Sequence, residues 1–156
     1  MGHCIRAFVG CNEQINALSQ CWGNRDTIQL SQGLSMMFLT DDLFDKITEL
    51  ANLKYCQTYD GFVYLTSSIM AVLEEHSHQG KLAYFETDYF GGKGSQAAIL
   101  YESGRQKFPA IITNDMVKSS SNVWAVNTIL KEFGVYRQDG KDEFDSIGLG
   151  DFRRME

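Results

Sequence analysis

The stretch from Lys81 to Gly104 constrains the fold more than any other part of the chain. Residues 82–90 and 98–101 are rich in aromatic and aliphatic side chains, which favour β-strands. Between these two runs the sequence carries three glycines, Gly91, Gly92 and Gly94. Glycine adopts positive φ without a steric cost, so this cluster suits a tight turn. The stretch therefore predicts a β-hairpin whose two strands are joined by a glycine-rich turn.

Other apolar runs predict further strands, at residues 4–9, 27–30, 34–39 and 105–108. Pro109 cannot donate to a strand ladder, so the last of these is expected to be an edge strand or to end there. Helices are expected where a capping residue precedes an apolar stripe, which occurs after Asn12, Thr40, Thr66 or Ser67, and Asn122. The order of elements predicts an α+β fold: a mostly antiparallel sheet with about four helices packed on it.

The helix expected after Thr40 has a clear division between its two sides. Its apolar stripe, expected to be buried, consists of Leu43, Ile47, Leu50 and Ala51. Its other side carries the four acidic residues Asp41, Asp42, Asp45 and Glu49, of which the first two suit the positive end of the helix dipole. Four apolar residues of the otherwise polar C-terminal tail are expected to hold that tail against the body of the domain: Phe144, Ile147, Leu149 and Phe152.

Length and composition favour one compact domain covering residues 1–156. The chain is 44% apolar with a single proline, so it has enough apolar surface for a core and shows no proline-rich linker. No apolar run reaches the ~20 residues that cross a bilayer. The first ten residues lack the pattern of a secretion signal. We therefore expect a cytoplasmic protein with no membrane partner, whose four cysteines, lacking CxxC spacing, are reduced thiols.

The net charge of −6 is unevenly distributed along the chain. Residues 1–80 hold four basic and nine acidic side chains, whereas residues 81–156 hold ten and eleven. Binding to nucleic acid needs lysine and arginine against phosphates, so we expect no nucleic-acid partner. An acidic surface instead attracts a basic protein, chiefly by speeding the encounter.

The glycine cluster does not fit a phosphate-binding loop. That loop needs lysine directly before serine or threonine and a helix immediately after it. Here Gly94 separates Lys93 from Ser95, and a strand is expected to follow. Without a helix N-terminus the converging N–H groups of an anion site are missing. We expect no nucleotide or other cofactor.

Glu86 and Asp88 are the best candidates for chemistry, because residues two apart in a strand point to the same face. Paired carboxylates serve as acid and base or bind a divalent metal. A small hydrolase or metal-dependent enzyme using Glu86, Asp88 and a histidine is therefore an alternative function. His76 and His78 are expected near a helix end, where residues two apart diverge and share a metal poorly. A solvated or binding face is favoured over an active site, and no metal site is expected.

The hairpin resembles a family signature, E-x-x-Y-F-G-G-x-G-x-Q, which runs here from Glu86 to Gln96. The signature occurs in small bacterial proteins, some of which are immunity proteins of polymorphic or contact-dependent toxin systems. Two later pieces resemble the same family: residues 126–130 together with Gly134 and Val135, and residues 142–149. The resemblance covers about the last half of the chain and, in the first half, only the order of the elements.

The resemblance implies an immunity protein of a contact-dependent growth inhibition or related system, which binds and neutralises a cognate toxin. Such proteins are small, lack catalytic residues and are usually acidic against a basic nuclease toxin. The candidate contact residues are then surface carboxylates: Asp41, Asp42, Asp45, Glu49, Glu86, Asp88, Asp142, Glu143 and Asp145. A structural subunit with another partner is a third reading of the same features.

Overall fold

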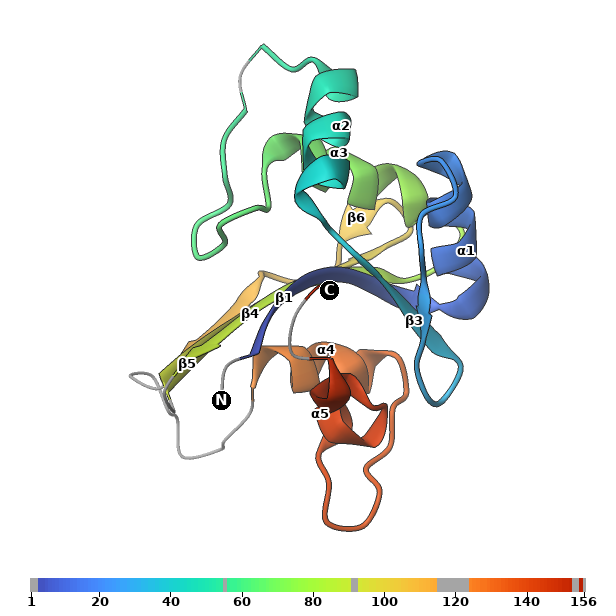
Figure 1. Cartoon of the computed structure of the whole chain (residues 1–156), viewed down its shortest axis with the longest axis vertical. Coiled ribbons are helices and arrows are strands. Elements are labelled where there is room, and N and C mark those ends of the chain that lie inside the picture. The colour runs from blue at the N-terminus through green and yellow to red at the C-terminus, as the bar shows by residue number, and fades with distance from the viewer. Residues whose placement is uncertain (1–2, 55, 91–92, 115–123, 153–154, 156) are drawn as a thin grey trace.

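The computed structural model describes residues 3–54, 56–90, 93–114, 124–152 and 155. Within these residues the chain folds into a single α+β domain, in which helices cover both faces of an antiparallel sheet (Figure 1). The sheet has seven strands in the order β2-β3-β1-β4-β5-β6, and β7 also pairs with β5. The predicted fold class is confirmed. No helix of the described part is both long and apolar enough to cross a membrane.

The order of strands and helices in the first half of the chain is the expected one. The strands are β1 (His3–Cys11), β2 (Ile28–Gln29), β3 (Leu34–Phe38), β4 (Leu82–Phe90), β5 (Lys93–Glu102), β6 (Arg105–Gln106) and β7 (Ile111–Asn114). The helices are α1 (Asn12–Cys21), α2 (Asp41–Ala51), α3 (Ser67–His76), α4 (Ala125–Glu132), α5 (Glu143–Ser146) and the 3₁₀ turn η2 (Leu149–Asp151).

The predicted hairpin is present as β4 and β5, paired from Leu82↔Tyr101 to Phe90↔Lys93. Since Phe90 lies opposite Lys93, only residues 91 and 92 connect the strands, and these two glycines lie outside the described residues. The prediction that Gly94 belongs to the turn is wrong, because Gly94 lies within β5, opposite Tyr89. A two-residue connection is sufficient to reverse an antiparallel pair, so the third glycine is left for the strand.

Pro109 divides the edge of the sheet into two short strands. The expected strand at 105–108 is reduced to β6, which pairs with Tyr101 and Glu102 of β5. After the proline the chain returns to the same partner as β7, whose Ile111–Asn114 pair with Ser95–Ala98. The apolar runs of the sequence did not predict β7. Proline interrupts the ladder without preventing the chain from pairing again beyond it.

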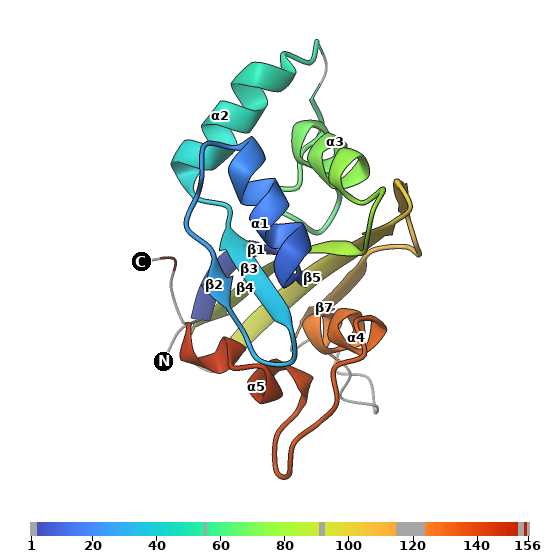
Figure 2. The ribbon, with the colours of Figure 1, turned by 90° about the vertical axis from the view of Figure 1, so that its right-hand side faces the viewer.

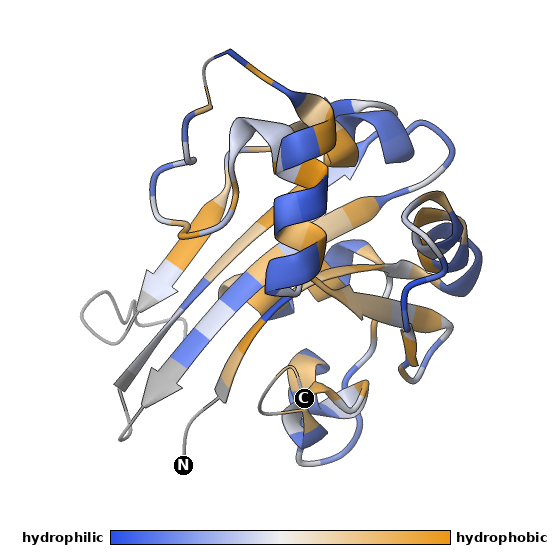
Figure 3. Ribbon diagram, turned by 45° about the horizontal axis from the view of Figure 1, so that its top comes forward, coloured by the Kyte–Doolittle hydropathy of each residue, from blue (hydrophilic) through white to orange (hydrophobic). Residues whose placement is uncertain are grey.

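The sheet separates two apolar cores, one on each face (Figures 2 and 3). On one face Phe8, Met37 and Tyr84 pack with apolar residues of α1, α2 and α3. On the other face Val9 and Phe85 pack against α4, α5 and η2. We call these the upper and lower faces, as they appear in Figure 1. Because β3 lies between β2 and β1, its residues are buried on both faces, as the continuous apolar run predicted.

The lower core includes the C-terminal tail, as predicted. Ile147 and Leu149 are buried, and Phe144 and Phe152 pack against the same cluster. The amide of Ser31, in the loop between β2 and β3, donates to the carbonyl of Ile147 at 3.1 Å, which ties the tail to the sheet. The apolar residues of the tail predicted this anchoring but not the short helices α5 and η2 that carry it.

Two of the predicted helix caps are present. The hydroxyl of Thr40 accepts a hydrogen bond from the amide of Leu43, and that of Thr66 accepts one from Ile69. Asn12 is not the cap of α1: Cys11 holds that position, and the Asn12 side chain accepts a hydrogen bond from Ser35 of β3 instead. The neighbouring strand thus captures the side chain that would have capped the helix. Trp124 precedes α4, and the predicted cap Asn122 lies outside the described residues.

The apolar stripe of α2 is shorter than predicted. Leu43 and Ile47 are buried, but Leu50 is 65% exposed. The last turn of α2 extends beyond the elements that cover its first two turns (Figure 2). The periodicity of the sequence locates the apolar stripe on α2, but the tertiary fold decides how many of its turns are covered.

Candidate functional site

The exposed side of α2 carries four carboxylates, Asp41, Asp42, Asp45 and Glu49, which we call the acidic stripe. The last three follow the spacing i, i+3 and i+7, so they line one side of the helix. Asp41 and Asp42 keep side-chain exposures of 83% and 80%. Burial of Leu43 and Ile47 fixes the rotation of α2 about its axis, and this turns the stripe toward solvent.

Two arginines partly neutralise the beginning of the stripe. Arg6 of β1 pairs with Asp41, and Arg25 pairs with Asp42 at 2.5 Å. The hydrogen bond from Arg25 is the main reason that the pKa of Asp42 is lowered. Within the described residues Asp45 and Glu49 form no ion pair. These two carboxylates are therefore the most available to an approaching cation.

Glu86 is bound from three directions on the upper face of the sheet. Its carboxylate accepts hydrogen bonds from the amide of Val63 at 2.7 Å and the amide of Tyr64 at 2.8 Å. The hydroxyl of Tyr84 donates a third, at 2.7 Å. Asp88, two residues further along β4, is exposed. The structure thus places one of the two predicted carboxylates in a structural role and leaves the other in solvent.

Tyr84, on the same face of β4 as Glu86, is fully buried. Its ring packs on Phe8 and Phe62, with centroids 5.5 and 6.1 Å apart. Burial raises the pKa of Tyr84 far above its usual value, and the negative charge of Glu86 raises it further. The hydroxyl remains protonated and is a permanent donor to Glu86.

Arg6 links this network to α2. It lies opposite Glu86 in the β1–β4 register, and its guanidinium carbon is 3.7 Å from the centre of the Tyr64 ring. The same side chain donates to Asp41 in the first turn of α2. A cation over an aromatic face is attracted by the electrons of the ring. Arg6, Glu86 and Tyr64 therefore join the sheet, the loop before α3 and the acidic stripe.

The remaining predicted carboxylates lie on the lower face (Figure 1). Asp142 caps α5 by accepting from the amide of Asp145, and it also accepts from Asn127. Glu143 has only 3% of its side chain exposed and pairs with Arg137 at 3.0 Å. Asp145 is exposed. Because the sheet separates this group from the acidic stripe, one flat partner surface cannot contact both groups.

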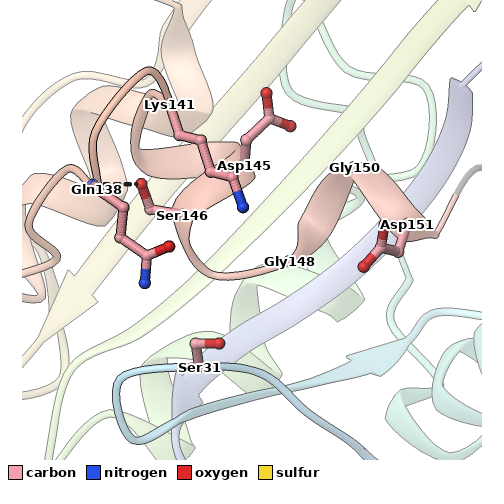
Figure 4. A pocket seen from close by; sticks show the side chains of 8 residues that line it. All are labelled: Ser31, Gln138, Lys141, Asp145, Ser146, Gly148, Gly150 and Asp151. Atoms are coloured by element: carbon pink, nitrogen blue, oxygen red, sulfur yellow. Dashed lines mark hydrogen bonds between the residues drawn. The ribbon is translucent and has the colours of Figure 1, made fainter.

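Asp145 borders an open depression of about 450 Å³ on the lower side of the molecule. Figure 4 shows Gln138 and Lys141 on one side of it, Asp151 on the other, and Ser31 facing them from the β2–β3 loop. All four of these side chains are exposed. The hydroxyl of Ser146, which also lines the depression, accepts a hydrogen bond from the backbone amide of Gln138. The depression is a solvated polar surface.

The structure does not bring His76 or His78 to the predicted carboxylates. The two histidines line a depression of about 260 Å³ together with Gln14 and Glu75, because α3 ends at His76 and His78 lies beyond it. His78 also lies against Gly104, next to the start of β4, whereas Glu86 and Asp88 lie ~13–20 Å further along that strand. The side chain of His3 lies outside the described residues.

The described part of the chain contains no cluster of three or more His, Cys, Asp or Glu side chains that could hold a metal ion. Cys4, Cys11, Cys21 and Cys56 are exposed free thiols. Comparisons with protein-family models, with curated proteins and with solved structures give no match to this chain.

Sequence reasoning missed two parts of the site. Arg6 is the only charged residue in the run from Cys4 to Gly10, and the period of two places it on the face of Glu86 when β1 pairs with β4. The isolated charge of Arg6 was thus visible in the sequence, but its position opposite Glu86 follows only once the pairing of β1 with β4 is known. The other part is a set of exposed apolar side chains near the loop before α3, for which the sequence gives no signal: Leu50, Leu53, Val63 and Ile112.

Proposed function

We propose that this chain is an immunity-type protein that binds and neutralises a basic toxin domain through the acidic stripe. The observation that carries the proposal is the position of Asp45 and Glu49: exposed, on one side of α2, and without ion-pair partners among the described residues. The resemblance of the hairpin to immunity proteins agrees with this reading. An inhibitor of this kind needs a rigid charged face rather than catalytic groups.

Electrostatic attraction acts mainly on the rate of association. A surface of one sign steers an oppositely charged partner and raises the association rate at low salt. Reversing the charges of Asp45 and Glu49 should therefore lower the association rate by roughly tenfold or more at low ionic strength. The dissociation rate should change less, because exposed charges are screened and contribute little to the bound state.

The test begins with the gene neighbourhood, where the proposal expects a toxin gene immediately upstream; the toxin domain found there is then co-expressed with this chain. Wild-type protein should protect cells from that toxin, and the purified pair should associate in a salt-dependent manner. The double variant Asp45→Lys with Glu49→Lys should protect poorly. The matched control reverses the same charge on the lower face, with Asp145→Lys and Asp151→Lys.

The two double variants distinguish the function from the contact face. If only the lower-face variant loses protection, the chain is an inhibitor but the acidic stripe is not its contact. Continued killing at high expression of the wild-type protein would contradict the proposed function itself.

A further inference from the structure

The loop before α3 is closed and pinned to the sheet although it has no regular secondary structure. The amide of Tyr59 donates to the carbonyl of Leu65 at 2.8 Å, and that of Phe62 donates to the carbonyl of Tyr59 at 3.1 Å. Phe62 and Leu65 are buried in the upper core, whereas Val63, between them and next to Tyr64, is 72% exposed. Residues 59–65, which we call the Val63 loop, therefore present one apolar side chain on a fixed backbone.

The fixed position of Val63 depends on Glu86. Two consecutive amides, those of Val63 and Tyr64, donate to its two carboxylate oxygens. Hydrogen bonds to a charged acceptor are stronger than those between neutral groups. The carboxylate lies on β4, within the sheet, so it acts as a rigid anchor beneath the loop.

The Val63 loop and the acidic stripe form one surface. The ring of Tyr64 packs edge-on against Phe44 of α2, with centroids 5.3 Å apart. Arg6 covers the same ring and pairs with Asp41. On α2, Asp41 is the i, i+3 neighbour of Phe44, and Asp45 lies one turn beyond Asp41. The loop that presents Val63 therefore adjoins the Asp41 end of the acidic stripe.

We infer that the partner is held jointly by Val63 and the acidic stripe, and that Glu86 is a positioning residue for this contact. The inference rests on the proposed function and specifies its partner. That partner is a basic polypeptide domain with an apolar depression among its lysine and arginine side chains. The charges of the stripe steer it, Val63 fills the depression, and Glu86 acts beneath the surface by keeping the loop in its bound geometry. Preorganisation of this kind reduces the ordering cost of binding.

The test separates the two roles by their kinetics. Probes are the upstream-encoded toxin domain and the variants Val63→Ser, Glu86→Gln and Tyr84→Phe, with Tyr136→Ser as the control. Tyr136 is exposed to a similar degree as Val63, 65% against 72%, but lies outside the Val63 loop and α2. Val63→Ser and Glu86→Gln should each raise the dissociation rate roughly tenfold with little change in the association rate or its salt dependence. Tyr136→Ser should change neither rate.

A second measurement needs no partner. Hydrogen exchange of the Val63 and Tyr64 amides, measured by NMR on the free protein, should accelerate at least tenfold in Glu86→Gln while the amides of β4 keep their protection. Tyr84→Phe leaves in place both carboxylate oxygens that accept from these amides, so it should accelerate their exchange less. It is the control for a general folding defect in Glu86→Gln.

Each outcome has a definite reading. If the wild-type protein binds the toxin domain and Val63→Ser or Glu86→Gln binds with unchanged rates, the joint surface is wrong while the proposed function stands. Unchanged amide exchange in Glu86→Gln would also overturn the positioning role. If the wild-type protein does not bind the toxin domain, the proposed function and the inference built on it both fail.

Discussion

Replacing Tyr84 with phenylalanine tests the buried polar network with the smallest possible change. The substitution removes one hydroxyl and keeps the ring, which packs against Phe8 and Phe62. The hydroxyl donates to Oε2 of Glu86 at 2.7 Å, and the same oxygen also accepts from the Tyr64 amide at 2.8 Å. A hydrogen bond to a charged group contributes about 1.5–3 kcal/mol to stability. Because Oε2 retains one donor, we expect a loss near the lower limit, about 1.5 kcal/mol.

The assay is reversible urea unfolding at pH 7, supported by thermal unfolding. For a chain of this length a loss of about 1.5 kcal/mol lowers Tm by about 3–6 °C. The matched control is Tyr101→Phe. Tyr101 is also buried on the upper face, but the described part of the chain offers its hydroxyl no hydrogen-bond partner. That variant should be close to wild type. If Tyr84→Phe destabilises the protein no more than Tyr101→Phe does, the reasoning about the network is wrong.

The same variant has a signature at alkaline pH. The pKa of Tyr84 is raised mainly by burial, so the folded protein keeps a proton that the unfolded chain releases above its ordinary pKa of about 10. The free energy of unfolding therefore falls as pH rises above about 10, by about 1.4 kcal/mol per pH unit for this residue. Tyr84→Phe removes that dependence, so its stability should decline less steeply than that of the wild type.

Three further predictions concern other parts of the fold. Glu143→Met should leave stability unchanged or raise it by about 1–2 kcal/mol in urea unfolding. Oε2 of Glu143 is buried and accepts no hydrogen bond from the described residues, and Arg137, which pairs with Oε1, is exposed enough to be resolvated. A clear loss of stability would contradict this. Burial is the main reason that the pKa of His76 is lowered, so on acidification the unfolded chain binds a proton before the folded protein does. The free energy of unfolding should therefore fall as pH drops through about 6.5 and level off below the folded-state pKa. His76→Gln should flatten that segment of the pH profile. Thr40→Ala should cost about 1 kcal/mol by removing the cap of α2, whereas the control Thr48→Ala, within the same helix, should be nearly neutral.

The hairpin and the capped helices could be predicted because each depends on local sequence, and the anchoring of the tail because its four apolar residues stand out in a polar segment. Thr40 precedes an apolar stripe, and the hydroxyl needs only the amide of Leu43, three residues away. The pairing of β4 with β5 needs only a short turn between two apolar runs. Where a distant element competes for the same group the prediction fails. Asn12 has the chemistry of a cap, but its side chain is engaged by Ser35, on a strand 23 residues away.

The candidate site was less predictable, because its residues acquire their roles through strand pairing. Glu86 and Asp88 both carry a carboxylate, and the sequence pattern places both on the same face of the strand. Only the position of the Val63 loop above β4 gives Glu86 two backbone donors besides the Tyr84 hydroxyl and leaves Asp88 in solvent. Glu143 belongs to an acidic run, yet burial against Arg137 removes it from the surface. A single sequence shows which residues could carry charge to a partner but not which carboxylates the fold uses internally.

The uneven charge of the chain acquires a spatial meaning from the fold. Residues 1–80, with nine acidic and four basic side chains, supply the three helices of the upper face, whereas residues 81–156, nearly balanced in charge, supply the hairpin and the lower layer. Two of the four basic residues in the first half, Arg6 and Arg25, are engaged by Asp41 and Asp42. The excess negative charge is therefore concentrated on one side of the sheet. A charge gradient across the molecule orients a basic partner before contact, which an even distribution of the same net charge would not do. Because that orientation acts through solvent, it should weaken as the Debye length falls from about 30 Å at 0.01 M salt to about 8 Å at physiological ionic strength.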